Sequence, residues 1–245
     1  MQVWETIFGN FLFQLDSLFR LHLACLALLI QSPIGVSNNC VIPVTRYLTM
    51  NYLAHLYLAE DSPESLIGNL LGDFVKGRSI DTYGDEIKKG IQLHQKVDIY
   101  TDSHPIVRES KRLISPVNRR YSGIIVDVFY DHFLAINWLD YSSISLKEFT
   151  AKAYRILEQN EAILPDSIKR VLPNIINRNV LMSYVEIQGI NYALQRISLR
   201  LKRENNLGSA SEELIANYER FKLDFSRFFP ELIDYVKTLR YKSKS

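Results

Sequence analysis

Histidine and aspartate recur among large apolar residues at four places in the chain. The stretches are NYLAHL (51–56), GNLLGDF (68–74), LHQKVDIYTDSHP (93–105) and DVFYDHF (127–133). Four of the five histidines in the sequence fall within them. Imidazole nitrogens and carboxylate oxygens suit divalent metals such as Mn²⁺, Mg²⁺, Fe²⁺ or Zn²⁺ when several helices direct them into one core. Together the four stretches indicate a metal-dependent hydrolase in a helical bundle.

The third stretch places His94, Asp98 and Asp102 on one face of a predicted helix. These side chains follow Ile87 and Ile91 at steps of about one helical turn. The apolar start of this stripe predicts that the face looks into a core, which would bury the histidine and both carboxylates. Burying a carboxylate is costly unless a partner neutralises its charge. A bound cation would do so, and we therefore expect His94 and Asp98 to bind a metal.

The fourth stretch lies in an apolar helix predicted from about 117 to 138. Asp127 and Asp131 share one face of this helix, and His132 lies about 100° further round. Acidic and imidazole groups are unusual in so apolar a helix, and Asp131 and His132 are candidates for the metal site. His104 precedes a proline and is equally well explained as a loop residue.

The elements that must position these residues are helical. No convincing period-two alternation of a β-strand appears from Met50 onward. Helices are predicted over 50–60, 61–77, 85–102, 117–138, 145–160, 178–203 and 209–228, with a last helix beginning at Pro230. The starts are supported by Asp61 or Ser62 before Pro63, by Ser145 with Glu148, and by Ser209 with Glu212. We predict an all-α fold with a single compact helical domain over 50–245.

Composition excludes some classes of function. The chain has 245 residues, a net charge of only +2 and 23% charged residues. So small a net charge argues against a nucleic-acid-binding protein that works by bulk electrostatics. Both cysteines, Cys25 and Cys40, lie in the first fifth of the chain, so the remainder offers no thiolate to a metal. A reducing, cytoplasmic setting with two free thiols fits this usage.

Residues 1–49 differ in character from the rest. The stretch 7–30 is strongly apolar but is interrupted by Asp16 and Arg20. The clean apolar run that follows is shorter than the ~20 residues needed to span a bilayer, so no stable membrane span is expected. Because regular helical patterning begins at Met50, we expect 1–49 to be an upstream extension and Met50 to be the natural start. The alternative is an amphipathic segment at a membrane surface.

Three long stretches resemble the acyl carrier protein phosphodiesterase family. They are MNYLAHLYLAEDSPESLIGNLLGDFVKG (50–77), GIQLHQKVDIYTDSHP (90–105) and DVFYDHFLAINW (127–138). The resemblance starts at Met50, is dense to Trp138 and continues more loosely towards the C-terminus. That family looks like a distant relative of the HD-type metal phosphohydrolases, whose His and Asp ligands sit on core helices. The resemblance therefore implies an HD-like helical bundle.

The resemblance also implies a reaction and a site. It implies a divalent metal, above all Mn²⁺, and hydrolysis of holo-acyl carrier protein to the apo-protein and 4′-phosphopantetheine. The matching positions expected at the metal are His55, Asp73, His94, Asp98, Asp102 and Asp131. Asp73 would serve as ligand or general base, and His132 would donate a proton to the leaving serine oxygen. The order Asp131–His132 is the reverse of the usual adjacent His-Asp pair.

Carrier proteins are small and acidic, so the resemblance implies a basic docking surface. The segment HPIVRESKRLISPVNRRY (104–121) carries Arg108, Lys111, Arg112, Arg119 and Arg120 against a single acidic residue. Such charges speed and orient docking more than they add affinity. A second basic cluster over 196–203 is equally well explained as a solvated helix face.

Two rival functions fit the same residues. The first is an HD-like hydrolase that acts on a nucleotide or another small phosphate ester. The second is a catalytically silent helical protein that only binds carrier proteins. Metal-type residues at every motif argue against the silent protein, whereas a metal site would serve either hydrolase.

Overall fold

The structure, a computed structural model, describes residues 52–242, and these form α-helices and 3₁₀ turns with no β-strand among them. The α-helices are α3 (Tyr52–Tyr57), α4 (Pro63–Leu71), α5 (Asp85–Ser103), α6 (Pro105–Leu113), α7 (Ser122–Ile136), α8 (Leu146–Gln159), α9 (Asp166–Lys169), α10 (Leu172–Asn177), α11 (Val180–Ser183), α12 (Ile187–Ser198), α13 (Ser211–Ala216) and α14 (Tyr218–Lys242). The 3₁₀ turns are η1 (Gly77–Thr82), η2 (Arg119–Tyr121), η3 (Trp138–Asp140), η4 (Glu161–Ile163) and η5 (Leu207–Ser209). The all-α prediction is confirmed. The predictions for 1–49, including Cys25, Cys40 and the start at Met50, lie outside the described residues.

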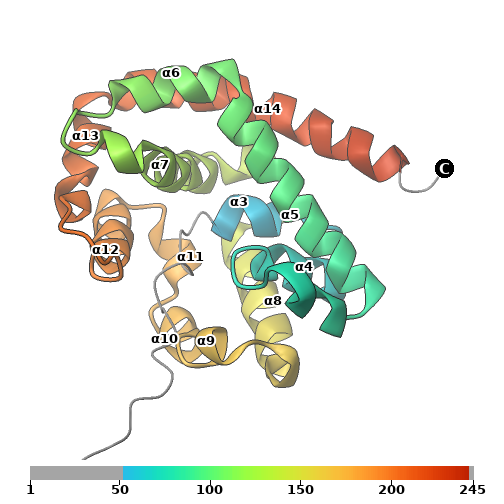
Figure 1. Cartoon of the computed structure of the whole chain (residues 1–245). Coiled ribbons are helices and arrows are strands. Elements are labelled where there is room, and N and C mark those ends of the chain that lie inside the picture. Colours follow the sequence, from blue (N-terminus) through green and yellow to red (C-terminus); the bar gives the residue numbers. More distant parts are fainter. Residues whose placement is uncertain (1–51, 243–245) are drawn as a thin grey trace, which may run out of the picture. The chain divides into compact units, whose positions relative to one another are not determined.

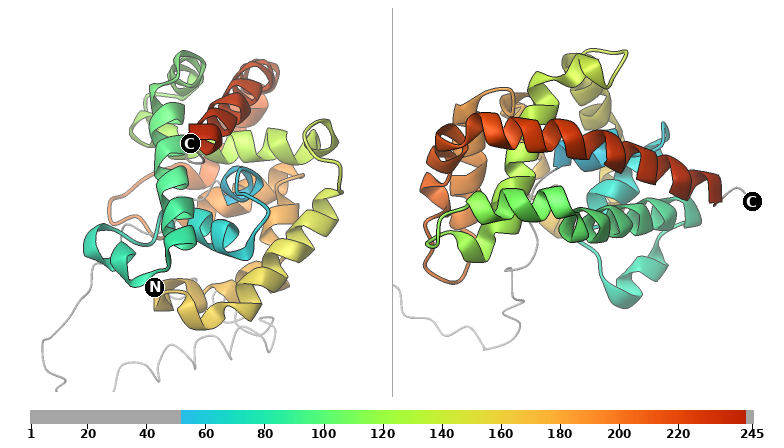
Figure 2. Two further views of the ribbon diagram at one scale, coloured as in Figure 1. Left: turned by 90° about the vertical axis from the view of Figure 1, so that its right-hand side faces the viewer. Right: turned by 90° about the horizontal axis from the view of Figure 1, so that it is seen from above.

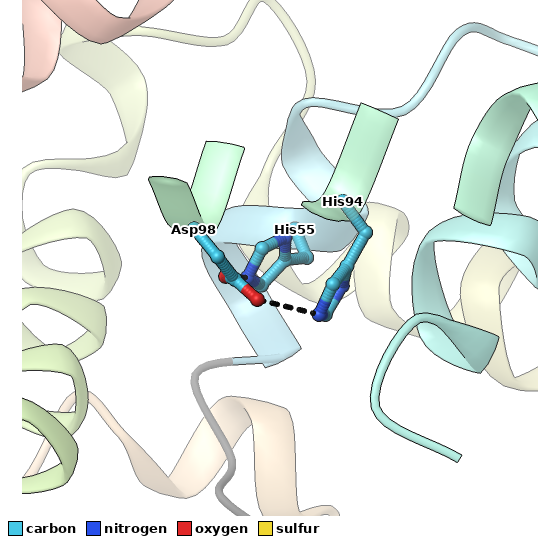
Figure 3. A group of neighbouring side chains, drawn as sticks. All are labelled: His55, His94 and Asp98. Atoms are coloured by element: carbon cyan, nitrogen blue, oxygen red, sulfur yellow. Dashed lines mark ion pairs between the residues drawn. The ribbon is translucent and has the colours of Figure 1, made fainter. Parts of the chain in front are cut away.

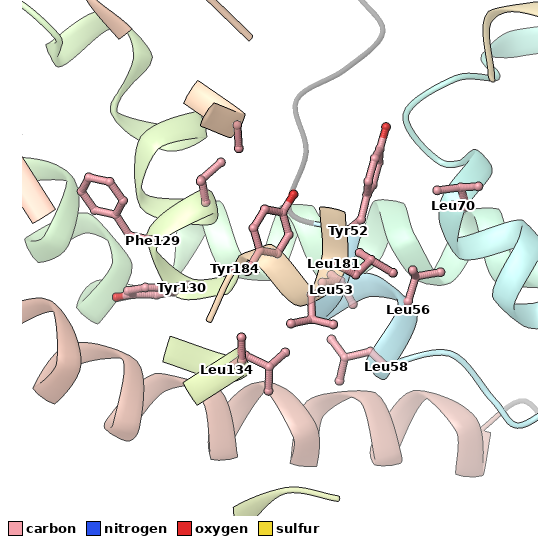
Figure 4. Close-up of a cluster of buried hydrophobic side chains, with 14 of the residues drawn as sticks. Tyr52, Leu53, Leu56, Leu58, Leu70, Phe129, Tyr130, Leu134, Leu181 and Tyr184 are labelled. Atoms are coloured by element: carbon pink, nitrogen blue, oxygen red, sulfur yellow. The ribbon is translucent and has the colours of Figure 1, made fainter. Parts of the chain in front are cut away.

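Helix α7 runs through the core of this unit. Ten of its residues are buried, and large apolar side chains occur all round it, as expected for a helix that other helices surround. It packs against α3, α6, α12 and α14 (Figure 1; Figure 2). Figure 4 shows Leu53 and Leu56 of α3 among the same buried side chains as Phe129 and Leu134 of α7. Helix α7 thus brings Asp131 to the start of α3.

Helices α4 and α5 cross with their backbones in close contact. The crossing lies at Gly68 and Gly90, where a Cβ built on Gly68 would stand 2.3 Å from the carbonyl oxygen of Ile87. The same Cβ would stand 2.8 Å from the Cα of Gly90. Glycine at both positions therefore allows α5 to lie against α4 and fixes the depth at which the side chains of α5 enter the core.

We expect Gly68→Ala to lower the free energy of unfolding by about 1–3 kcal/mol, the usual cost of overpacking. The clash is with backbone atoms, which cannot rotate away, and it outweighs the gain in helix propensity that alanine brings. Urea denaturation followed by circular dichroism measures the change. The control is Gly123→Ala at the start of α7, where the new Cβ would lie 3.7 Å from Lys111, an ordinary contact. Equal stability of both variants would contradict the close crossing.

Two helix starts and one helix end follow the predicted caps. The Ser62 side chain accepts a hydrogen bond from the Ser65 amide before α4, and Ser145 and Glu148 form a reciprocal capping box at α8. Helix α5 ends before Pro105, with His104 in an extended conformation. Pro105 then begins α6, a helix that the sequence analysis did not predict.

The helix predicted over 61–77 ends early, at Leu71. The chain turns just after it, and the amides of Phe74 and Val75 both donate to the carbonyl of Leu71. Gly77, where the helix was predicted to stop, instead has a positive φ of 58°. The turn after Leu71 brings Asp73 next to the side chains of α5.

Near the C-terminus the predicted boundaries are wrong in three places. The helix predicted over 178–203 divides into α11 and α12, because Glu186 is extended between them. The predicted Ser209–Glu212 capping box is absent, since α13 begins after Ala210 with no side-chain cap. Pro230 lies inside α14 rather than at its start.

A buried stripe explains why α14 continues past Pro230. A proline inside a helix removes one hydrogen bond and costs about 3 kcal/mol. The fully buried side chains on both sides of it are Phe221, Phe225, Phe228, Phe229, Leu232 and Val236. Burial of one such side chain contributes about 1.5–3 kcal/mol, so the stripe outweighs the missing hydrogen bond.

None of the described helices is long and apolar enough to cross a membrane.

Candidate metal centre

Two histidines and one carboxylate converge between α3 and α5 (Figure 3). His55 comes from α3, and His94 and Asp98 come from successive turns of α5. The Nε2 atom of His55 lies 3.2 Å from Oδ1 of Asp98, and Nε2 of His94 lies 3.3 Å from Oδ2 of the same residue. The two imidazoles stack with their centroids 3.7 Å apart. One ligand atom from each of the three residues falls within 4.8 Å of the others.

The nitrogens of this group suit a divalent metal. His94 donates from Nδ1 to the carbonyl of Asn69 at 2.7 Å, so Nε2 is the nitrogen that faces Asp98. Nε2 of His94 and both ring nitrogens of His55 are buried without a well-directed hydrogen bond. Buried polar atoms left in this state are costly unless something binds them. Paired with a carboxylate, they match the nitrogen and oxygen ligand sets of Mn²⁺, Fe²⁺ and Zn²⁺.

Charge in the group is shared among its three members. Burial and the neighbouring His94 lower the pKa of His55. Burial opposes protonation of His94 as well, but the carboxylates of Asp73 and Asp98 outweigh it and raise the pKa of His94 to about 10. Burial likewise opposes the charge on Asp98, and the two histidines nevertheless hold its pKa well below the usual range. A proton on His94 thus occupies the place that a cation would take.

Next to the histidines lies a hollow of about 230 Å³ whose wall is largely carboxylate. Its lining residues are Asp73, Asp98, Thr101, Asp102, Gly123, Ile124 and Asp127. Oδ1 of Asp73 lies 3.5 Å from Nε2 of His94, so Asp73 belongs to both the hollow and the histidine group. Asp102 is the outermost member, with a side chain that is 71% exposed and an ion pair to Lys111 at 2.6 Å.

Asp127 also lines this wall, although it is not among the site residues expected from the sequence. Burial, with the nearby charge of Asp98, raises the pKa of Asp127 well above its ordinary value. The signal was present in the sequence, because Asp127 lies one turn before Asp131 on the same face of an apolar helix.

The predicted inward stripe on α5 holds only for its first half. Ile91 and His94 are buried, whereas the side chains of Asp98 and Asp102 are 46% and 71% exposed. The expectation that both carboxylates are buried is therefore wrong. Val97 and Thr101 keep the second half of α5 packed on the core, but the face that carries Asp98 and Asp102 turns towards solvent, and these carboxylates form the wall of the hollow instead.

Asp131 and His132 lie apart from the group formed by His55, His94 and Asp98. Asp131 is fully buried, and its oxygens accept hydrogen bonds from the amides of Leu53 at 3.0 Å and Ala54 at 2.9 Å. Burial raises the pKa of Asp131 to about 8, although these amides lower it.

His132 makes its own set of hydrogen bonds. Its Nδ1 donates to the carbonyl of Tyr184 at 2.8 Å, and its Nε2 accepts from the hydroxyl of Tyr218 at 3.0 Å. Burial lowers the pKa of His132, which favours this neutral ring. Both of its nitrogens are thus occupied within the protein.

The predicted basic segment forms α6 and η2 beside the hollow. Lys111 contacts the hollow through Asp102, and Arg112 pairs with Glu109. Arg108 and Arg120 are exposed, and Arg119 donates from Nε to the carbonyl of Ile114 at 3.0 Å. Helix α6 is held firmly, because its buried Ser110 donates to Asp224 of α14 at 2.9 Å.

Comparison with known proteins agrees with the motifs. The sequence model described as "Acyl carrier protein phosphodiesterase" matches residues 50–232. Proteins named acyl carrier protein phosphodiesterase from Pectobacterium atrosepticum and Escherichia coli are each 35% identical to the chain over 190 residues, with 98% and 96% of their lengths covered. The protein of that name from Photorhabdus laumondii is 32% identical over 186 residues, with 94% covered. These alignments include 77%, 76% and 76% of this chain, respectively. No solved structure is significantly similar. The chain belongs to the acyl carrier protein phosphodiesterase family.

Proposed function

We propose that the chain hydrolyses the phosphodiester bond of holo-acyl carrier protein and releases 4′-phosphopantetheine and the apo-protein. One observation carries the proposal: buried histidine nitrogens without a well-directed hydrogen bond meet Asp98 beside an open, carboxylate-lined hollow in a member of this family. We assign the activity to the domain over 50–245. The sparse cysteines agree with a cytoplasmic location, which is part of the proposal.

The centre is proposed to hold a divalent metal, Mn²⁺ in the first place. His55, His94 and Asp98 would bind it, and Asp73 stands close enough to His94 to join them or to act as base. When bound, such a cation offsets charge on the phosphoryl oxygens and activates water near neutral pH. The ligand atoms are nitrogen and oxygen only, which also suits Mg²⁺, Fe²⁺ and Zn²⁺ to different degrees.

Proton transfer is assigned to carboxylates that face the hollow. Asp73 is placed to align or deprotonate the attacking water, since it lies beside His94 on the hollow wall. The leaving serine oxygen needs a proton from a group that also faces this space. We assign that role to Asp127 in place of His132, because both nitrogens of His132 already bond Tyr184 and Tyr218.

The carrier protein is proposed to dock on α6 and η2. Arg108, Lys111, Arg112, Arg119 and Arg120 lie on these elements, and Lys111 links them to the wall of the hollow. A prosthetic group that extends from an acidic partner at this surface would have a short path to the metal centre. Charges of this kind raise the rate of association and set its orientation.

We expect Arg108→Glu with Arg112→Glu to raise KM for holo-acyl carrier protein about tenfold or more and to change kcat little. Reversal of the charges slows docking, whereas the metal centre is untouched. Kinetics against holo-protein and against a small phosphodiester separate the two effects, because only the former should respond. Lys147→Glu with Arg155→Glu, which makes the same charge change on exposed residues of the distant α8, is the control. Equal losses on both substrates would argue against a docking surface.

Incubation of holo-acyl carrier protein with the enzyme and Mn²⁺, followed by mass spectrometry, tests the proposed reaction. We expect loss of the phosphopantetheine mass from the carrier protein. Cleavage of nucleotides with no change in the carrier protein would indicate the rival HD-like hydrolase. Binding of the carrier protein without cleavage, in the presence of each candidate metal, would indicate the non-catalytic protein.

A further inference from the structure

We propose that Asp131 is a positioning residue that holds α3 so that His55 faces the metal centre, and that it is not itself a ligand. The inference rests on the proposed metal site and adds to it a residue on a different helix. Hydrogen bonds cross between α7 and α3 at this residue.

The contact between Asp131 and α3 uses both carboxylate oxygens. Oδ2 accepts from the amide of Leu53 at 3.0 Å and Oδ1 accepts from the amide of Ala54 at 2.9 Å. These amides belong to the first turn of α3, where no carbonyl of the same helix is available to accept them. Asp131 therefore caps α3 from a position 77 residues away in the sequence.

Helix α3 needs such an anchor because it is short. It has six residues, and a helix of this length is not stable on its own in water. His55 follows Ala54 directly, so the turn that Asp131 holds is the turn that carries the ligand. Loss of the cap would free this turn to fray and would change the distance from His55 to His94 and Asp98.

The two carboxylates of α7 have different roles. Asp127, one turn earlier on α7, lines the hollow, whereas Asp131 is fully buried with both oxygens engaged on α3. For Asp131 to bind a metal it would have to release two amides, and buried amides without partners are costly. The geometry thus indicates that Asp131 holds His55 in position.

Asp131→Asn tests the inference, because it keeps the shape but turns one acceptor into an amide donor that faces another donor. We expect the folded variant to bind Mn²⁺ about tenfold more weakly or worse, by calorimetric titration, in line with other supporting residues of metal sites. We also expect faster hydrogen exchange at Leu53 and Ala54. The matched control is Asp224→Asn, another buried carboxylate, whose hydrogen-bond partners are Ser110 of α6 and Arg220 of α14. It should lose stability and keep the wild-type affinity for Mn²⁺.

The outcomes separate the inference from the proposed function. Failure of the wild type to bind Mn²⁺, Fe²⁺ or Zn²⁺ would show that the proposed metal site is wrong. Wild-type affinity in folded Asp131→Asn, or an equal loss in Asp224→Asn, would overturn the positioning role and leave the site standing. If Asp131→Asn does not fold, amide hydrogen exchange of the wild-type protein is measured with and without Mn²⁺. Binding of Mn²⁺ should slow exchange at the amides of Leu53 and Ala54. Unchanged exchange at these amides would overturn the inference.

Discussion

Asp98→Asn is expected to reduce the affinity for Mn²⁺ and the turnover of holo-acyl carrier protein by at least two orders of magnitude. Asp98 is the member of the centre that contacts both histidines, at 3.2 Å and 3.3 Å. Asparagine keeps its shape but removes the negative charge that would balance a cation held by the Nε2 atoms of the two histidines. The apo-protein should remain folded, because the side chain is 46% exposed and asparagine can be solvated there. Metal titration and thermal melts with and without Mn²⁺ measure both effects.

The control for this variant lies on the same helix. Asp85 is in the first turn of α5, its side chain is 88% exposed, and its ion-pair partner is Lys88. Asp85→Asn should leave metal affinity and turnover unchanged. If Asp98→Asn instead melts at a much lower temperature but binds Mn²⁺ as the wild type does, Asp98 is a structural partner of the histidines and the proposed centre is wrong.

The general architecture could be predicted because helix signals are local. The Ser145–Glu148 capping box, the Ser62 cap and the proline after His104 each act within a few residues, and each appears in the structure. The boundaries that failed depend on distant contacts. Helix α14 crosses Pro230 because of the phenylalanines that it buries, and α4 ends at Leu71, directly before Gly72, which lies against the ring of His94.

The roles of individual site residues could be predicted only in part, for a related reason. Periodicity shows which residues share a face of a helix, but it does not show what that face meets along its length. On α5 the face leaves the core between His94 and Asp102. On α7 one face meets the hollow at Asp127 and the end of α3 at Asp131. Asp131 bonds two backbone amides, and because almost every residue has such an amide, the sequence does not show which ones it bonds.

Gly72→Ala is expected to have a similarly large effect on the metal centre, although residue 72 binds nothing. A Cβ at this position would stand 2.2 Å from Cγ and 2.3 Å from Cδ2 of His94. The backbone of Gly72 has ordinary right-handed helical angles, so alanine brings no backbone strain of its own. The methyl group has to displace the imidazole, which would break the hydrogen bond from His94 to the carbonyl of Asn69 and turn Nε2 away from Asp98.

We expect Gly72→Ala to bind Mn²⁺ at least a hundredfold more weakly and to lose turnover in proportion. Its melting temperature without metal should fall as well, since overpacking costs about 1–3 kcal/mol. Gly208→Ala is the matched control, because its Cβ would lie 3.6 Å from Gln195, in ordinary contact and away from His94. If Gly72→Ala acts by displacing the ring of His94, it should have no further effect once that ring is removed. Gly72→Ala with His94→Ala should therefore bind Mn²⁺ as weakly as His94→Ala alone. Wild-type affinity in folded Gly72→Ala would show that the centre tolerates a moved His94, and His94 would then not be a ligand.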